Sequence, residues 1–354
     1  PALRPGRRAR AAGQPELELG LERDPGAGPS TSEPAAPSVA LAVPDRLSAT
    51  YDPAAAAAYF GRRPAAVVKR AAQIALESAG FLAALALDRA RQPEGQQKAE
   101  AAAQRAAQLR GLLGRLGPTF VKCGQAISIR VDLLPEAYLK ELRQLQDNVP
   151  PFDTGAARAI LDEELRAQGG VAGVFEYLSA EPIASASLGQ VYKGRLKGTG
   201  QEVAVKVQRP DVLPEISLDL YILRFFAPII KERQNLNSDV LGLVDEWGRG
   251  FVAELDYRLE AQNAQQFLDA MEARGIPAVT TARPLPDLTT DRVLCTEWVT
   301  GERLERSSEE DVAQLCGVAL TAYLTMLLDT GVLHADPHPG NLLRTADGRL
   351  CILD

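Results

Sequence analysis

The chain of 354 residues is 46% hydrophobic and 24% charged, the balance of an ordinary globular protein with room for a sizeable core. Its formal net charge of −7 excludes a general attraction to nucleic acids or anionic lipids, because such binding depends on clustered Lys and Arg side chains. The cysteines are scattered without a Cys-x-x-Cys motif, so we predict neither a zinc site nor a disulfide framework, and a reducing compartment is favoured. They are Cys123, Cys295, Cys316 and Cys351.

The first fifty residues are rich in Pro, Gly, Ala and Ser, a composition that does not supply a packed core. Four arginines lie in the first ten positions, and the first fifteen residues contain no acid. Residues 1–50 are therefore interpreted either as a disordered leader or as an organelle transit peptide. Leaders of this kind serve plastids and mitochondria alike.

Residues 51–150 carry helical patterns and are predicted to form a helical extension. Leu139, Leu142 and Leu145 recur every three residues, and Pro135 suits the beginning of their helix. The apolar run FLAALAL at 81–87 falls far short of the roughly 18 to 20 apolar residues that a membrane-spanning helix requires. It suits either a core helix or a membrane-facing helix, and we expect a soluble or peripheral protein.

Residues 151–300 begin with apolar and polar residues in alternation on either side of the turn KGTGQ. This pattern predicts a strand, a loop, a strand, a hairpin and a third strand. Helical patterns return in PEISLDLYILRFFAPII and over 239–275, which we treat as one helix, and RVLCTEWV is predicted to be another strand.

Residues 301–354 begin with a long helix, over about 308–330. Ser307 and Glu310 form a predicted capping box at its start. Its apolar face is predicted to contain Val312, Leu315, Ala319, Ala322 and Met326. The final segment NLLRTADGRLCILD is predicted to be a hairpin that turns at Asp347 and Gly348.

The loop VLHADPHPGN contains both histidines of the chain, His334 and His338. Protein kinases have a catalytic loop H-R-D-x-x-x-x-N, and His334, Asp336 and Asn341 occur at its offsets. Asp336 is then the candidate base. Asn341 and Asp354 become candidate ligands for Mg²⁺, which prefers oxygen donors.

A metal hydrolase is the rival interpretation, with His334, His338 and Asp336 as three ligands of one ion. Such a site draws ligands from several segments, and the chain has no third histidine. The kinase interpretation is therefore preferred.

Upstream, VAVK resembles the kinase V-A-I-K, so Lys206 is predicted to neutralise nucleotide phosphates. Its partner should be a helical glutamate. Glu254 and Glu260 are the candidates; six residues apart on one helix, they would occupy nearly opposite faces, and only one could pair with Lys206 directly.

The loop that covers the phosphates in kinases has the pattern GxGxxGxV, and here two of its glycines are alanines. An added Cβ keeps the backbone further from phosphates, so this loop should hold nucleotide differently. The strand at 292–299 is expected to provide the hinge. The predicted nucleotide contacts are Ala184, Ser185, Ala186, Ser187, Gly189, Val191, Lys206, Glu297 and Val299.

The motifs KCGQ, IASASLGQVYKG, VAVKVQRP, ELDYRLEAQNA and LHADPHPGN together resemble the UbiB family of atypical kinases, also called ADCK or aarF-domain proteins, in its cyanobacterial and plastid branch. The likeness runs from about residue 51 to residue 354. It implies an α+β, kinase-like, two-lobed fold: an N-lobe of antiparallel sheet with helices, then the start of a helical C-lobe, preceded by the helical extension. It also implies binding of ATP or ADP with Mg²⁺.

The resemblance further implies residue roles. Glu260 would be the partner of Lys206, and Glu254 with Asp256 would form a motif facing the nucleotide. The remaining implied residues are Lys122, Gly124 and Gln125 of the KxGQ motif, which would lie over the active site and block protein substrates. Because the chain ends at Asp354, it resembles a fragment, and we expect the apolar face of the helix over 308–330 to be partly uncovered and turnover to be absent.

Two functions follow as hypotheses. The first is an atypical kinase or ATPase that supports isoprenoid quinone metabolism, in plastids often at lipid droplets called plastoglobules, with prenyl lipid or quinone-biosynthesis proteins as partners. The second is a nucleotide-responsive pseudokinase that binds lipid or protein at a membrane. A plastid location is favoured, with the mitochondrion as the alternative.

Overall fold

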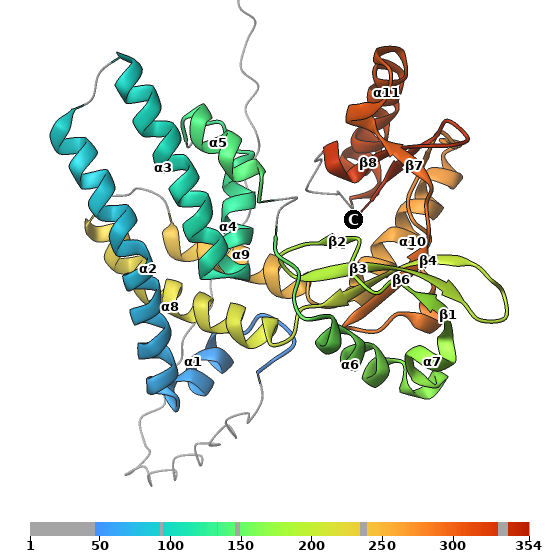
Figure 1. The fold of residues 1–354 in the computed structure, drawn as a ribbon, viewed down its shortest axis with the longest axis horizontal. Coiled ribbons are helices and arrows are strands. Elements are labelled where there is room, and N and C mark those ends of the chain that lie inside the picture. Colours follow the sequence, from blue (N-terminus) through green and yellow to red (C-terminus); the bar gives the residue numbers. More distant parts are fainter. Residues whose placement is uncertain are drawn as a thin grey trace, which may run out of the picture. The chain divides into compact units, whose positions relative to one another are not determined.

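The computed structural model describes residues 47–354 except 93–94, 133, 146–148, 234–238, 332–338 and 354. The protein is mixed α+β, with antiparallel sheet and many helices, as the sequence predicts (Figure 1). The domain boundaries at 50, 150 and 300 stay predictions. The four cysteines, all within the described part, are free thiols, and burial raises the pKa of Cys123, Cys295 and Cys351 to about 12.

The described part of the helical extension contains five helices, several of which begin at proline. They are α1 (Pro53–Gly61), α2 (Pro64–Arg91), α3 (Gly95–Leu116), α4 (Pro118–Ser128) and α5 (Glu136–Arg143). The predicted leucine repeat is confirmed, because Leu139, Leu142 and Leu145 are all buried, and Pro135 occupies the cap position before α5.

An antiparallel sheet follows α6 (Thr154–Glu164) and α7 (Gly170–Val174). Its strand order is β1-β3-β4-β6, with β2 paired to β3, and the expected strands and hairpin are confirmed. The strands are β1 (Phe175–Leu178), β2 (Ala184–Ser185), β3 (Gly189–Leu196), β4 (Glu202–Gln208) and β6 (Val293–Glu297). Alternate residues such as Tyr192, Val205 and Cys295 are buried in one cluster with Ile160 and Leu161 of α6, so α6 covers one face of the sheet.

Three helices lie in the sequence between β4 and β6: α8 (Val212–Arg233), α9 (Val240–Ala253) and α10 (Tyr257–Ala273). The expectation of one continuous helix over 239–275 was wrong. Glu254 is the C-cap of α9, and Asp256 is the N-cap of α10, because its carboxylate accepts a hydrogen bond from the backbone N–H of Arg258 in the first turn of that helix. Asp is a favourable N-cap residue, and capping by Asp256 begins a new helix here in place of a continuation of α9.

The last part contains a second sheet of order β5-β9-β8-β7 beside α11 (Glu309–Thr325), which continues as a π-helical turn, η4 (Met326–Thr330). The strands are β5 (Val279–Thr280), β7 (Gly301–Arg303), β8 (Leu342–Thr345) and β9 (Leu350–Ile352). The predicted turn is confirmed, with Gly348 at φ +80°.

The apolar face of α11 is confirmed, since Leu315, Ala322 and Met326 are buried with Val312 and Ala319 packed beside them. The cap prediction was one residue off: Ser308, not Ser307, accepts the hydrogen bond, from the N–H of Asp311. On their other side α11 and η4 expose leucines, and they are Leu320, Leu324, Leu327 and Leu328.

Two of the described helices are long and apolar enough to cross a membrane by length and composition: Pro64–Arg91 and Glu310–Thr330. The expectation based on the apolar run at 81–87 did not include these two helices. It counted uninterrupted apolar residues, whereas these helices interrupt them with few charges. Composition alone leaves open how such a helix is used.

Arg70 of α2 forms ion pairs with two carboxylates of α8, Glu215 at 3.5 Å and Asp219 at 2.7 Å. The Arg70 guanidinium donates from Nε and Nη2 to the two carboxylate oxygens of Asp219, at 2.7 and 2.9 Å, and Nη2 also donates to the Leu116 carbonyl. The Asp219 side chain is fully buried and that of Arg70 is 11% exposed. A bidentate pair in such a position fixes the angle between the two helices.

Replacing Asp219 with Ala should remove the bidentate partner of the buried Arg70 guanidinium and leave it with the longer contact to Glu215, at 3.5 Å. We expect a loss of about 3–5 kcal/mol in the free energy of unfolding, measured by urea denaturation. Glu246→Ala is the matched control, because its partner Arg249 and Glu246 itself are mostly exposed, and it should change little. Equal stability of the two variants would contradict the assignment.

Candidate functional site

The site is organised around an ion pair between β4 and α10. The Lys206 ammonium lies 2.9 Å from each carboxylate oxygen of Glu260, and the two side chains are 18% and 27% exposed. Glu260 thus lies against Lys206, as the family resemblance implies for its partner. A lysine held in this way presents a fixed positive charge at the edge of the site.

Strand register places the first loop residue and Lys206 on one face of the sheet. Ala184 is paired with Val191, Val191 with Lys206, and Lys206 with Leu294. Directly paired residues of antiparallel strands point to the same side. Ala184 and Val191 therefore lie in one row with the Lys206 side chain, on the side of the sheet opposite α6.

Tyr257, which sequence analysis missed, lies beneath this row. The Lys206 ammonium is 5.1 Å from the centroid of its ring. A Cβ built on Gly189 would approach the Tyr257 hydroxyl oxygen to 2.4 Å and the Val207 carbonyl oxygen to 2.7 Å. Gly189 is thus required for packing within the protein, and the signal for Tyr257 was its place three residues before Glu260 on α10.

The loop between β2 and β3 is tightly held. The N–H of Ala186 donates to the Gly189 carbonyl at 2.8 Å, and Ser187 and Leu188 are buried while Ala184 and Ala186 are exposed. Leu188 packs in a cluster with residues of α8 and α9 and with Cys123 of the KCGQ motif. The hydroxyl of Ser185 is buried without a hydrogen-bond partner in the described structure. The loop is therefore anchored at its tip in the helical part of the protein.

A second tie fixes α10 relative to β4. The Gln208 side-chain amide donates to the Leu255 carbonyl at 2.7 Å, and Gln208 is itself buried. Leu255 lies between Glu254 and Asp256 in the break between α9 and α10. Gln208 was not among the predicted site residues, because a side-chain contact to a distant backbone has no local pattern.

The KxGQ residues divide into two roles. Lys122 of α4 forms an ion pair with Glu254, so this glutamate is engaged with the extension. Gly124 permits close packing, since a Cβ there would lie 2.6 Å from a Leu145 methyl and 2.8 Å from a Leu113 methyl. Gln125 donates to the Leu145 carbonyl at 3.0 Å.

Asp256 is engaged with its own helix. Besides capping α10, its carboxylate binds the Arg258 guanidinium at 2.8 Å through both oxygens. The hydrogen bond from Arg258 holds the pKa of Asp256 below its usual value. The side chain is therefore ionised near neutral pH.

The predicted hinge residues lie further along the same sheet or directly after it. Glu297 ends β6, paired with Val203, and accepts a hydrogen bond from the Gln201 side-chain amide at 3.2 Å. Since Lys206 is paired with Leu294, Glu297 lies about 10 Å along the strand from Lys206. Val299 follows β6 and is half-buried.

Asn341 ends the short helix η5 (Pro339–Asn341), and its carbonyl accepts a hydrogen bond from the Leu353 N–H at 2.8 Å. The hairpin thus brings Asn341 beside Leu353. Asp336, Asp354 and the two histidines lie outside the described residues. The roles of Asp336 and Asp354, and the rival histidine metal site, stay predictions.

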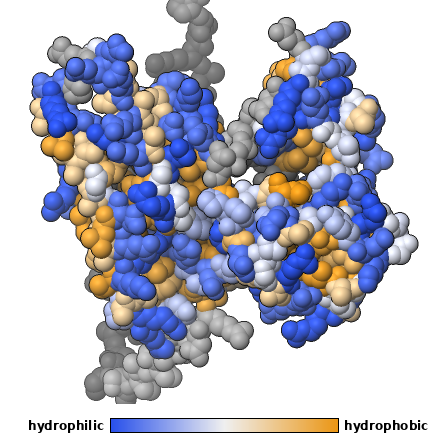
Figure 2. Space-filling view, viewed as in Figure 1, coloured by the Kyte–Doolittle hydropathy of each residue, from blue (hydrophilic) through white to orange (hydrophobic). Residues whose placement is uncertain are grey.

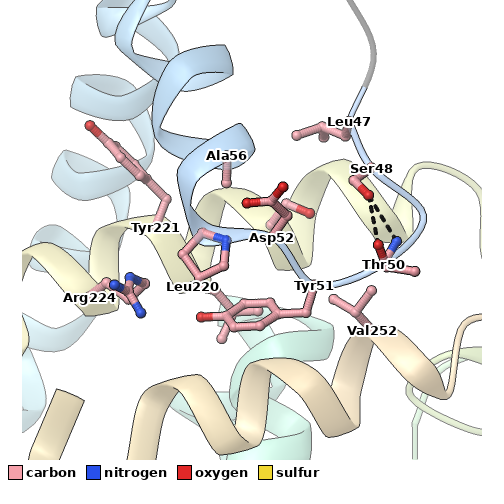
Figure 3. A pocket seen from close by; sticks show the side chains of 12 residues that line it. Leu47, Ser48, Thr50, Tyr51, Asp52, Ala56, Leu220, Tyr221, Arg224 and Val252 are labelled. Carbon is pink, nitrogen blue, oxygen red and sulfur yellow. Dashed lines mark hydrogen bonds between the residues drawn. The ribbon is translucent and has the colours of Figure 1, made fainter. Parts of the chain in front are cut away.

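A small pocket of about 20 Å³ lies elsewhere, where residues 47–56 meet α8 and α9 (Figure 3). The Tyr51 hydroxyl donates to Asp245 at 2.8 Å, and its ring covers Gly248, where a Cβ would lie 2.4 Å from a ring carbon. The volume suits about one water molecule. The Tyr51 contacts beside this pocket hold the start of the extension against α9. None of the predicted nucleotide-site residues lines the pocket.

The sheet, the lysine–glutamate pair and the helical segment after the hinge define a protein-kinase-like fold. Residues 144–354 match the ABC1 atypical kinase-like domain. The chain belongs to this family.

Several relatives have similar sequences. An uncharacterised aarF domain-containing protein kinase of Arabidopsis thaliana, described as chloroplastic, is 45% identical over 250 residues, which are 71% of this chain and 35% of the relative. The chloroplastic activity of bc1 complex kinase 3 of the same plant is 40% identical over 310 residues, 86% of this chain and 42% of the relative. An uncharacterised protein of Synechocystis is 40% identical over 316 residues, 86% of this chain and 53% of the relative. The chain spans between a third and about half of the length of these relatives.

Gly189→Ala should force its new methyl group against the Tyr257 hydroxyl and the Val207 carbonyl. We expect a loss of about 1–3 kcal/mol in the free energy of unfolding, because backbone must move, measured by chemical denaturation. Gly114→Ala is the control: nothing lies within 4 Å of its Cβ, and this position in α3 should gain up to about 1 kcal/mol from helix propensity. A neutral Gly189→Ala would show that the contact is not tight.

Proposed function

We propose that the protein binds ATP with Mg²⁺ on the face of the sheet that carries Lys206, and that it acts as an atypical kinase or ATPase. The observation that carries the proposal is the Lys206–Glu260 pair in one row with Ala184 and Val191. A lysine oriented by a glutamate suits the phosphates, and the loop at 184–189 suits contact above them. Glu297 and Val299 would hold the base at the hinge.

The residues present fit a magnesium ion in their donor chemistry. Asn341 supplies an amide oxygen and Asp354 a carboxylate, and Mg²⁺ prefers a few such oxygens while it keeps several waters. When bound, the ion neutralises charge on the phosphate oxygens. Asp336 would accept the proton of the attacking hydroxyl or water.

Mg·ATP at about 100 times its dissociation constant should stabilise the protein by about 2.7 kcal/mol, seen as a rise of several degrees in the melting temperature. Lys206→Ala and Asp354→Asn should each abolish the rise, because the first removes the phosphate charge partner and the second a metal ligand. Differential scanning fluorimetry of the full chain measures both.

Lys140→Ala is the control for loss of a lysine charge, since Lys140 is exposed on α5. It should keep the full rise. Absence of any rise in the unsubstituted protein, or retention of the rise in Lys206→Ala, would refute nucleotide binding at this site.

A second candidate function is a regulator that uses nucleotide only as a conformational signal, with a lipid or a protein as its partner. Two observations favour it: the Lys122–Glu254 pair ties the extension to the break before α10, and Leu188 anchors the alanine-rich loop. An anchored loop closes less readily over phosphates.

Asp336→Asn separates the two candidates. Loss of a catalytic base lowers turnover by about 10² to 10⁴, so phosphate release by the longer parent protein and lipid turnover in cells should both fall if that protein is an enzyme. If cells that carry Asp336→Asn restore lipid turnover as well as the unsubstituted protein does, the regulator is favoured.

We further propose a plastid location and a role in isoprenoid quinone or lipid metabolism, with peripheral association at a lipid surface such as a plastoglobule. The chloroplastic descriptions of two relatives support the location. The lipid role is supported by the family resemblance.

A further inference from the structure

The helix α2 has two distinct sides. Its half-buried positions recur every three or four residues, which is the period of one helix face. They are 67, 70, 71, 74, 77, 78, 81, 84, 85 and 88. All other positions from 64 to 91 are exposed, so α2 packs along one side only.

The charges of α2 are sorted between these two sides. Both acids of α2 belong to the packed side: the Glu77 carboxylate binds Arg115 of α3 at 2.8 Å, and the Asp88 carboxylate binds Arg105 of α3 at 2.6 Å. Within the described helix Pro64–Arg91, no acid lies on the exposed side. The overall negative charge of the protein is thus absent from this surface.

The exposed side is uncharged from residue 72 to residue 87, a length of about 22 Å. Leu76 is 77% exposed, Leu82 59% and Leu87 53%, among small residues that are mostly Ala. Figure 2 shows hydrophobic residues along this helix, at the left of the view. The cations Lys69 and Arg89 lie beyond the two ends of this stretch. We call the exposed residues 72–87 the outer face of α2.

The ion pairs with α3 argue against a spanning role. A spanning α2 would carry Arg105 and Arg115 into hydrocarbon, together with the polar residues of α3. Helices in the bilayer core rarely carry such groups on surfaces open to lipid. A helix with one charged, packed side and one apolar side instead lies parallel to a lipid surface.

A second copy of this chain is a poor occupant. A strip about 22 Å long and about 10 Å wide offers roughly 220 Å², whereas a stable protein–protein interface buries about 800 Å² on each partner. A lipid surface makes no such demand for a large complementary partner. The terminal cations also match the phosphate level of anionic headgroups.

We propose that the outer face of α2 docks flat in the headgroup region of a lipid surface, with Leu76, Leu82 and Leu87 inserted and Lys69 and Arg89 at the level of the phosphates. The inference names the contact surface for the lipid association proposed above and is independent of nucleotide binding. Because α2 is bound to α3 by Glu77 and Asp88, docking orients the whole extension.

Co-sedimentation of the full chain with phosphatidylcholine–phosphatidylglycerol vesicles tests the proposal. Leu76→Glu with Leu82→Glu should weaken binding at least about tenfold, because each substitution removes a buried apolar side chain from the lipid interface and adds a charge. Both leucines are exposed, so the fold should be unchanged by circular dichroism and melting temperature. The Mg·ATP shift of the same variant should also persist, which separates this failure from a failure of the nucleotide proposal.

The matched control is Leu320→Glu with Leu324→Glu on α11, the other apolar helix, where these leucines are 61% and 45% exposed. It should bind vesicles as the unsubstituted chain does. Lys69→Glu with Arg89→Glu should weaken binding several-fold to the mixed vesicles and little to pure phosphatidylcholine.

Three results would overturn the proposal: no binding by the unsubstituted chain, equal loss in the α11 control, or full binding by the α2 variant. A dimer in light scattering that Leu76→Glu with Leu82→Glu dissociates would also overturn it, with a second copy as the occupant.

Discussion

The ion pair between Lys206 and Glu260 requires β4 and α10 to keep a fixed separation, although 54 positions separate the two residues in the chain. Most of these positions form α8 and α9, which leave the sheet and return. Two hydrogen bonds hold α10 against the sheet where the chain returns from α9. The Gln208 side-chain amide of β4 donates to the Leu255 carbonyl, and the Tyr257 N–H donates to the Asp291 carbonyl. Such long-range closure carries an entropic cost that local contacts must offset. The lysine charge is thus positioned by the end of α9 as much as by the sheet.

The extension and the sheet meet through α8 and α9. The Arg70–Asp219 pair fixes α2 against α8, and the Tyr51 ring fits over Gly248 of α9. Leu188, at the tip of the loop, is buried among α8 and α9 residues with Cys123 beside it. A displacement of α8 would therefore move both the extension and the loop between β2 and β3, because closely packed interiors transmit strain.

Local patterns were enough for the strands, the hairpins and the leucine repeat of α5, since alternation and helical spacing depend on neighbouring residues only. The break at 254–256 was missed because Asp256 competes with helix continuation, and single-residue competition is decided by tertiary contacts. Ser307 and Ser308 are both suitable N-cap residues, so the local sequence does not decide which of them caps the helix.

Lys206 and Glu260 were found by resemblance. Tyr257, Gln208 and Leu188 act through partners distant in the sequence, and no spacing predicts such contacts. Gly189 was attributed to phosphate approach, whereas its space is occupied by the Tyr257 hydroxyl.

The break between α9 and α10 gives each lysine its own carboxylate. Lys122 has Glu254 and Lys206 has Glu260, and only the capped residues 255–256 and one helical turn lie between these glutamates. Lys122 belongs to α4, which packs through Gly124 against Leu113 of α3, and α3 in turn binds α2 through Arg105 and Arg115. The outer face of α2 and Glu260 are therefore joined by one unbroken series of packed contacts. A ligand at one end of this series affects the other end only if it binds two conformations of the protein with different affinities. The Arg115–Glu77 and Lys122–Glu254 pairs are the most exposed ion pairs in the series, and partly exposed ion pairs contribute little on their own, so these are the points at which the two ends can separate.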